Sequence, residues 1–81
     1  MNLNAAVSTR IIQLLNERDW TSYRLAIESG IPTSTVSNII LGKCRSCNLS
    51  TVLNICRGFR IEPQEFILTP LFLLKNLDDN D

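Results

Sequence analysis

Short polar side chains gather on one face of a helix predicted over residues 33–41, TSTVSNIIL. At about 100° per residue, Ser34, Ser37 and Asn38 fall on the same side of that helix, and Thr33 points out of its first turn. Small uncharged hydrogen-bonding groups suit close approach to base edges, and an Asn amide can bind adenine through two hydrogen bonds. A face that meets only solvent would more often carry Glu, Lys or Gln, which form helices better. The pattern therefore favours a DNA-reading surface.

Cationic and hydroxyl groups follow this helix directly. Gly42 can end it in a left-handed conformation, and Lys43, Arg45 and Ser46 lie in the loop that comes next. Beside the end of a groove-bound helix, such side chains would reach the phosphate backbone and fix the position of the protein along the DNA. The alternative is that they are ordinary surface groups of a loop.

Three cysteines and no histidine limit the metal and redox chemistry of the chain. Cys44 and Cys47 form a single C-x-x-C pair, which is half of a usual zinc site. We interpret them as reduced loop residues, with a metal or redox role, including a site pooled between two chains, as the alternative. Cys56 falls in an apolar helical stripe and is expected in the core.

The sequence offers no arrangement typical of an enzyme. It has no histidine, no recognisable nucleophile–base pair, no phosphate-cradling glycine loop and no paired carboxylates in a recognisable site. We therefore expect neither catalysis nor a cofactor.

The polar helix needs a partner helix that holds it in place. Thr21 is predicted to cap a helix over residues 22–29, in which Ala26 is small enough for a neighbouring helix to approach closely. Gly30 suits the end of that helix, and Ile31 is expected to fill the turn as a buried residue. Two short helices joined by such a turn form a helix-turn-helix.

The apolar side of residues 33–41 is formed by Val36, Ile39 and Ile40, while Leu41 falls on the polar side. Apolar residues at helical spacing predict three further helices for this side to pack against. These helices span about 5–18 with Asn4 as N-cap, 49–59 with Asn48 as N-cap and Leu49 facing inward, and a stretch from Glu62-Pro63 with Phe66 and Ile67 facing inward. The predicted fold class is all-α, a compact five-helix bundle.

Residues 71–77, LFLLKNL, are apolar on nearly every side of a predicted short sixth helix. A helix of this kind is usually covered on several faces. We expect a second copy of the chain as the cover, with packing on the first helix as the alternative. The residues expected at the dimer contact are Leu71, Phe72, Leu74 and Leu77. Residues 1–69 would then form the DNA-binding domain, and residues 70–81 the dimerisation helix and an acidic tail.

The charge of the 81-residue chain is unevenly distributed, although its net charge is zero. Residues 1–60 carry seven basic and three acidic side chains, whereas residues 61–81 carry one basic and five acidic side chains. A basic body is compatible with DNA binding, because the local field matters more than the sum. The composition, 44% hydrophobic and 20% charged, is that of a folded protein. Neither a signal peptide nor a membrane-spanning run is recognisable, so we expect a cytoplasmic protein.

The order and spacing of many residues resemble the Cro/CI-type helix-turn-helix family, also called XRE-like or lambda-repressor-like. The likeness extends from about Ile11 to Phe66. The matching residues are Trp20-Thr21, Leu25-Ala26, Gly30-Ile31, Ser34 to Ile39, Gly42-Lys43, Leu49 to Thr51, Ile55-Cys56 and Ile61 to Phe66. Where the family often pairs an Arg in the first helix with a Glu in the third, this chain has Leu15 and Ile40. Well-packed apolar groups can replace a buried ion pair without harm to folding.

The resemblance implies a five-helix bundle in which the helices at 22–29 and 33–41 bind DNA. By position, the residues that match base-reading sites are Thr33, Ser34, Ser37 and Asn38, and those that match phosphate contacts are Thr21, Ser22, Lys43, Arg45 and Ser46. Such proteins are similar to bacterial and phage repressors that bind two half-sites as dimers.

The residues and the resemblance together predict a sequence-specific DNA-binding transcriptional regulator, in particular a homodimeric repressor without a cofactor. The main alternative is a protein-interaction module or an antitoxin on the same scaffold, because a fold does not fix a function. A metal or redox sensor is a third possibility, and it rests on Cys44 and Cys47 alone.

Overall fold

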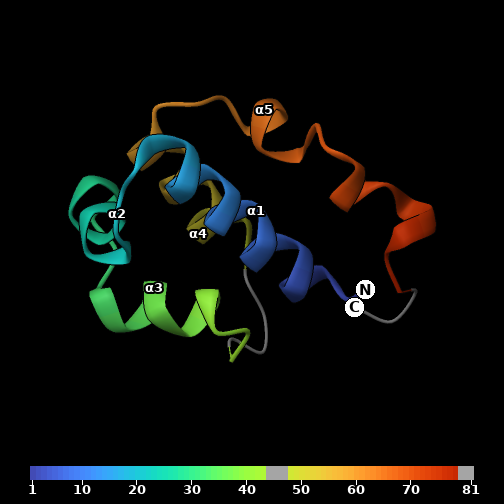
Figure 1. Cartoon of the computed structure of the whole chain (residues 1–81), viewed down its shortest axis with the longest axis horizontal. Helices are drawn as coiled ribbons and strands as arrows, with labels where there is room; N and C mark the ends of the chain where they lie inside the picture. The colour runs from blue at the N-terminus through green and yellow to red at the C-terminus, as the bar shows by residue number, and fades with distance from the viewer. Residues whose placement is uncertain (44–47, 79–81) are drawn as a thin grey trace.

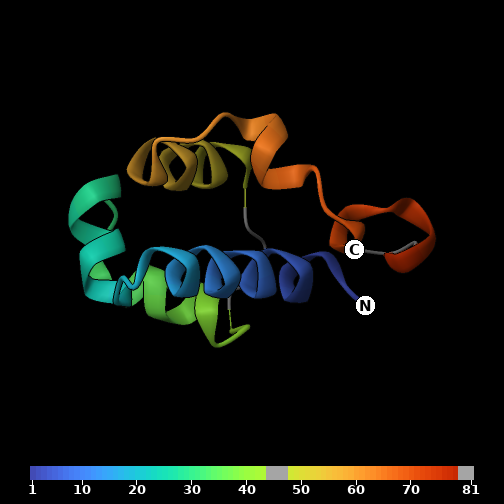
Figure 2. The same cartoon turned by 45° about the horizontal axis from the view of Figure 1, so that its top comes forward.

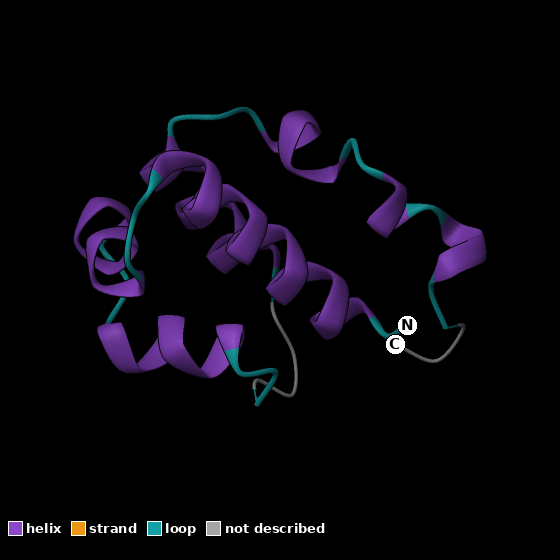
Figure 3. Ribbon diagram, in the orientation of Figure 1, coloured by secondary structure: helices purple, strands orange, loops and turns teal. Residues whose placement is uncertain are grey.

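The computed structural model describes residues 1–43 and 48–78, and every regular element in those ranges is helical (Figures 1 and 3). The elements are α1 (Leu3–Arg18), α2 (Ser22–Ser29), α3 (Thr33–Ile40), α4 (Leu49–Phe59), α5 (Pro63–Ile67) and two short 3₁₀ helices, η1 (Pro70–Phe72) and η2 (Leu74–Asn76). The predicted all-α bundle of five helices is confirmed. Figure 2 shows α1 running between α3 on one side and α4 on the other. None of the described helices is long and apolar enough to cross a membrane.

Side-chain caps fix where three of the helices begin. Thr21 and Asn48 each accept a hydrogen bond from the backbone N–H three residues further on, at 3.1 and 2.8 Å, as predicted for α2 and α4. The predicted start of α1 is wrong by two residues. Asn2, rather than Asn4, is the N-cap, and its side chain accepts a hydrogen bond of 2.7 Å from the N–H of Ala5.

The core lies where α1, α2, α3 and α4 meet. Its largest fully buried side chains are Phe59, Phe66, Ile11, Leu25, Ile55, Val36 and Cys56. Burial raises the pKa of the Cys56 thiol, so this cysteine behaves as a small apolar core residue, as predicted. Leu15 is buried in the same cluster and Ile40 packs against it. Both positions thus contribute apolar side chains to the core.

Two sites hold neighbouring helices close together. At Gly58 in α4, an added Cβ would lie 2.9 Å from the Cβ of Ser29 in α2, which is closer than carbon atoms pack. Between α1 and α5, Arg10 donates through Nε and Nη2 to the backbone carbonyls of Phe66 and Glu65, both at 2.9 Å. Carbonyls at a helix end have no partner within the helix, so Arg10 both satisfies them and anchors α5.

The C-terminal segment does not form the predicted sixth helix over residues 71–77. It contains two 3₁₀ turns separated by Leu73, whose backbone is extended (φ −63°, ψ 133°). The side-chain amide of Asn76 donates to the carbonyl of Pro70 at 2.7 Å, and Phe72 packs against the core. A seven-residue segment is too short to nucleate a stable α-helix alone, so these local contacts decide its path instead.

The first residue of the acidic tail lies against the N-terminus. Oδ1 of Asp78 is 3.4 Å from the terminal ammonium of Met1, and the backbone N–H of Asp78 donates to the Met1 carbonyl at 3.0 Å. These contacts hold the C-terminal segment alongside the start of α1 (Figure 1).

Candidate nucleic-acid interface

The turn between α2 and α3 has the geometry that its residues predict. Gly30 adopts a left-handed conformation (φ +71°), and its N–H donates to the carbonyl of Ala26 at 3.0 Å. Ile31 is buried beneath the turn, and Pro32 stands immediately before the first residue of α3. α2, the turn and α3 therefore form a helix-turn-helix, with α3 at the outer edge of the molecule (Figure 1).

α3 has one buried and one outward face. Val36 and Ile39 are almost completely buried. On the other face Thr33, Ser34 and Asn38 are exposed, and Ser37, which lies between them, is half-buried. The residues predicted to read bases thus lie together on the outward face of one helix.

The outward polar groups of α3 are available to a ligand. Within residues 1–43 and 48–78, no side-chain hydrogen bond is formed by Thr33, Ser34, Ser37 or Asn38. Their hydroxyl and amide groups can therefore donate to and accept from an incoming surface without first breaking a bond inside the protein.

The end of α3 fixes the backbone of the next predicted phosphate-binding residue. Gly42 is left-handed (φ +72°), as predicted, and its N–H donates to the carbonyl of Ile39 at 3.1 Å. The N–H of Lys43 donates to the carbonyl of Asn38 at 2.9 Å, and the Lys43 side chain is exposed. The helix cap therefore fixes the backbone from which the Lys43 side chain extends, directly after Gly42. Arg45 and Ser46, together with Cys44 and Cys47, lie outside the described residues.

The other predicted phosphate contacts, Thr21 and Ser22, lie at the start of α2. Thr21 is exposed, and its hydroxyl oxygen already caps the helix, while Ser22 is half-buried. The hydroxyl hydrogen of Thr21 remains free to donate to an anion, since the cap uses only the oxygen as an acceptor.

Trp20 fixes the corner between α1 and α2, next to these hydroxyl groups. Its ring stacks on Phe59 with centroids 5.5 Å apart and an angle of 18° between the planes. The guanidinium groups of Arg18 and Arg24 lie 5.5 and 4.8 Å from the Trp20 ring centroid. Arg24 also pairs with Glu28 at 2.8 Å. These two arginines were not singled out from the sequence. The spacing of four residues from Trp20 to Arg24 could have indicated that the two side chains are neighbours.

Apolar side chains are exposed around the C-terminal segment, and among the four residues expected at a dimer contact Leu74 is the exposed one. Leu71, Phe72 and Leu77 are half-buried within the same chain, and Leu74 is 86% exposed. Leu49 and Ile67 were expected to face inward. That prediction is wrong, because Leu49 is 70% and Ile67 49% exposed at the ends of their short helices. The next residue after α5, Leu68, is 85% exposed.

Two adjoining grooves run beneath these side chains. One, of about 320 Å³, is lined by Leu3, Val7, Leu49, Val52, Phe66, Ile67 and Phe72. The other, of about 260 Å³, is lined by Ile67, Leu68, Thr69, Pro70, Phe72 and Leu73. Ile67 and Phe72 belong to both, so the grooves form one continuous apolar surface, which we name the C-terminal groove.

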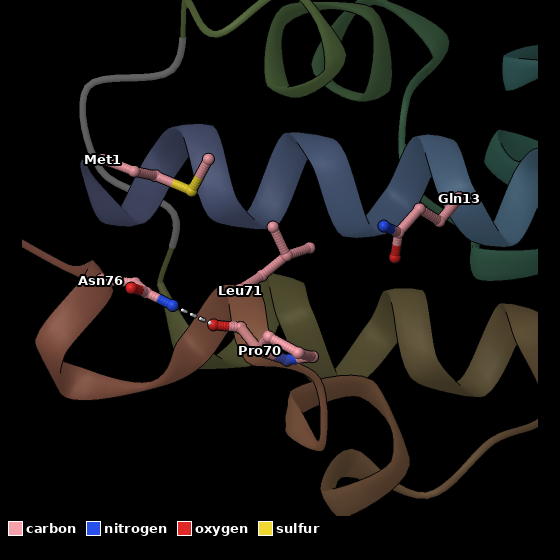
Figure 4. Close-up of a pocket in the computed structure, with 5 residues that line it drawn as sticks. All are labelled: Met1, Gln13, Pro70, Leu71 and Asn76. Atoms are coloured by element: carbon pink, nitrogen blue, oxygen red, sulfur yellow. Dashed lines mark hydrogen bonds between the residues drawn. The ribbon is translucent and has the colours of Figure 1, made fainter.

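A third hollow lies between α1 and the C-terminal segment. It has a volume of about 440 Å³ and is lined by Met1, Gln13, Pro70, Leu71 and Asn76 (Figure 4). The Asn76 amide is turned toward the Pro70 carbonyl, and the exposed side chain of Gln13 bonds at 3.4 Å with Arg10. The side-chain amides of Gln13 and Asn76 at this hollow therefore each bond to another residue of the protein.

Comparison with known proteins agrees with this geometry. No curated protein and no solved structure matches the chain. The sequence model of the Cro/C1-type HTH DNA-binding domain matches residues 10–70, which contain α2, the turn and α3 and most of the described bundle. The chain belongs to the Cro/C1-type HTH DNA-binding domain family.

Proposed function

We propose that this protein is a sequence-specific transcriptional regulator that inserts α3 into the major groove of DNA and acts as a repressor. The observation that carries the proposal is the row of short polar side chains on the outward face of α3, in which Thr33, Ser34 and Asn38 are exposed. Base edges in the major groove differ in their donors and acceptors, so hydroxyl and amide groups held on one rigid helix can tell them apart.

Phosphate contacts would set the position of α3 along the groove. Lys43 carries the first charge that follows α3 in the sequence, and its backbone is held by the helix cap. Thr21 and Ser22 would donate from the start of α2, while the same role for Arg45 and Ser46 rests on their place in the sequence. These contacts carry little sequence information but hold the reading helix in register.

Two copies would be needed for tight binding. The reading side chains are short, and the chain has zero net charge, so one copy neutralises few phosphates. Joining two half-sites raises affinity without any new contact in either half.

We place the contact between the two copies at the C-terminal groove. Its exposed apolar side chains are Leu49, Ile67, Leu68 and Leu73, which together present on the order of 500 Å² per copy. This lies in the upper part of the range for the largest apolar patch of a typical monomer, and patches of this size are often functional. Leu68 projects beside the groove that it helps to line. In a two-fold dimer each copy presents the same patch, so Leu68 of one copy can enter the groove of the other and the reverse.

Selection of bound sequences from a random DNA pool tests the proposal with the full chain. We expect enrichment of a symmetric site with two half-sites, and lower transcription from a promoter that carries this site. Asn38→Ala should lose about 1–3 kcal/mol per half-site on the selected site and relax one base position in each half-site. Failure to enrich any sequence, together with a stable complex with another protein, would instead indicate a protein-interaction module or an antitoxin.

A further inference from the structure

An apolar side chain stands in line with the polar groups of α3. Leu41 follows the last residue of α3, but its backbone is still helical (φ −79°, ψ −2°), and its N–H donates to the carbonyl of Ser37 at 3.0 Å. It therefore continues the helical spiral on the face of Ser34, Ser37 and Asn38. Its side chain is 64% exposed. Gly42 then turns the chain away in a left-handed conformation, so Leu41 is the last side chain of this row.

The chemistry of Leu41 restricts what it can meet in a major groove. Its side chain has no donor or acceptor, so it cannot bond to phosphate or to the polar edge of a base. The C5-methyl group of thymine is the apolar group that base pairs present in the major groove. Three residues along a helix advance by about 4.5 Å, close to the 3.4 Å rise of one base pair. Leu41 can therefore reach a base pair next to the one that Asn38 reads.

We propose that Leu41 is a specificity-determining residue that contacts the C5-methyl group of one thymine in each half-site. This inference rests on the DNA-reading role proposed above for α3. The half-site should then contain an adenine for Asn38 and, within one or two base pairs of it, a thymine for Leu41. A cytosine at the thymine position would leave the leucine against a polar edge without an apolar partner.

Deoxyuridine tests this contact, because it differs from thymidine by the methyl group alone. In the site selected by the full chain, each thymine would be replaced in turn by deoxyuridine, and the Kd measured by fluorescence anisotropy. We expect that at one thymine position in each half-site a single replacement raises the Kd about fourfold. This is the change in affinity that corresponds to the burial of one methyl group. Leu41→Ala should bind the two DNAs equally at that position, whereas Leu41→Met, which keeps an apolar side chain, should retain most of the difference.

Ile27→Ala is the matched control. Ile27 is an aliphatic residue of similar exposure, 62%, but it lies on α2 and outside the row, so this variant should keep the full fourfold difference. The inference would be overturned if Leu41→Ala kept the wild-type sensitivity of the Kd to deoxyuridine. It would also be overturned if no single thymine methyl group of the selected site affected the Kd. Both results would leave the DNA binding of α3 intact. Failure of the wild-type chain to select any sequence would overturn the proposed function, and this inference with it.

Discussion

The hydroxyl of Ser8 in α1 donates a hydrogen bond of 2.6 Å to the backbone carbonyl of Ile40, the last residue of α3. The last carbonyls of a helix have no partner within the helix, and Ser8 itself is buried. This single bond satisfies one of them and ties the end of α3 to the longest helix of the bundle. The position of the polar face therefore depends in part on a residue outside the helix-turn-helix.

Ser8→Ala should lower the free energy of unfolding by about 1–2 kcal/mol, because it leaves a carbonyl at the end of α3 without its partner. Urea unfolding followed by circular dichroism measures the change. Ser50→Ala is the control, since Ser50 is exposed in α4, and it should alter stability by less than about 0.5 kcal/mol. Equal losses for the two variants would show that the bond to Ile40 has no particular weight.

Lys43→Ala should weaken binding to selected and random DNA by the same factor. Its charge is expected to meet a phosphate rather than a base, so the slope of log K against log salt should fall by about one for each bound copy, or about two for a dimer. Titrations at several salt concentrations measure this slope. Lys75→Ala removes an equal charge from an exposed residue of η2 and should leave the slope unchanged. A loss confined to the selected site would instead assign Lys43 to base reading.

Leu68→Asp should convert the proposed dimer to a folded monomer. The side chain is 85% exposed in the single chain, so the substitution should not disturb the core, but it would place two carboxylates into apolar grooves across the two-fold axis. Sedimentation equilibrium measures the association. Ile27→Asp, an equally polar change at an exposed residue of α2, should remain dimeric. A Leu68→Asp variant that dimerises like the wild type would move the interface elsewhere.

The sequence was most informative where local chemistry decides the structure. Thr21, Gly30, Asn48 and Gly42 lie in caps or turns whose geometry depends on the residue type itself, and the structure confirms each of them. Helical periodicity decides which residues of α3 share its outward face. It was therefore also predictable that the polar residues of α3 lie next to one another. The role of each residue on DNA stays a prediction.

The C-terminal part could not be predicted in the same way, because nonlocal packing decides it. Composition alone does not show that Phe72 pairs with Phe66, with ring centroids 5.8 Å apart, while Leu74 faces solvent. Periodicity likewise placed Leu49 and Ile67 on inward faces. Both lie at ends of short helices, where no neighbouring element covers them among the described residues.

Gly58→Ala tests the close approach of α2 and α4, which positions the helix-turn-helix on the bundle. In an open helix this change usually stabilises a protein by up to about 1 kcal/mol, since Ala forms helices better than Gly. Here the new methyl group would lie 2.9 Å from the Cβ of Ser29 and 3.0 Å from its Cα and N. Because two of these atoms are backbone, a rotamer change cannot relieve the contact, and α2 must move.

We therefore expect Gly58→Ala to lower the free energy of unfolding by about 1–3 kcal/mol, and to weaken DNA binding because α2 carries α3 with it. Adding Ser29→Gly removes the 2.9 Å contact but leaves the two at 3.0 Å, so the double variant should recover only part of the loss. Thermal unfolding of the wild type, Gly58→Ala and the double variant measures how much of the loss comes from the 2.9 Å contact. A single Gly58→Ala variant with a higher melting temperature than the wild type would mean that helix propensity outweighs packing at this crossing.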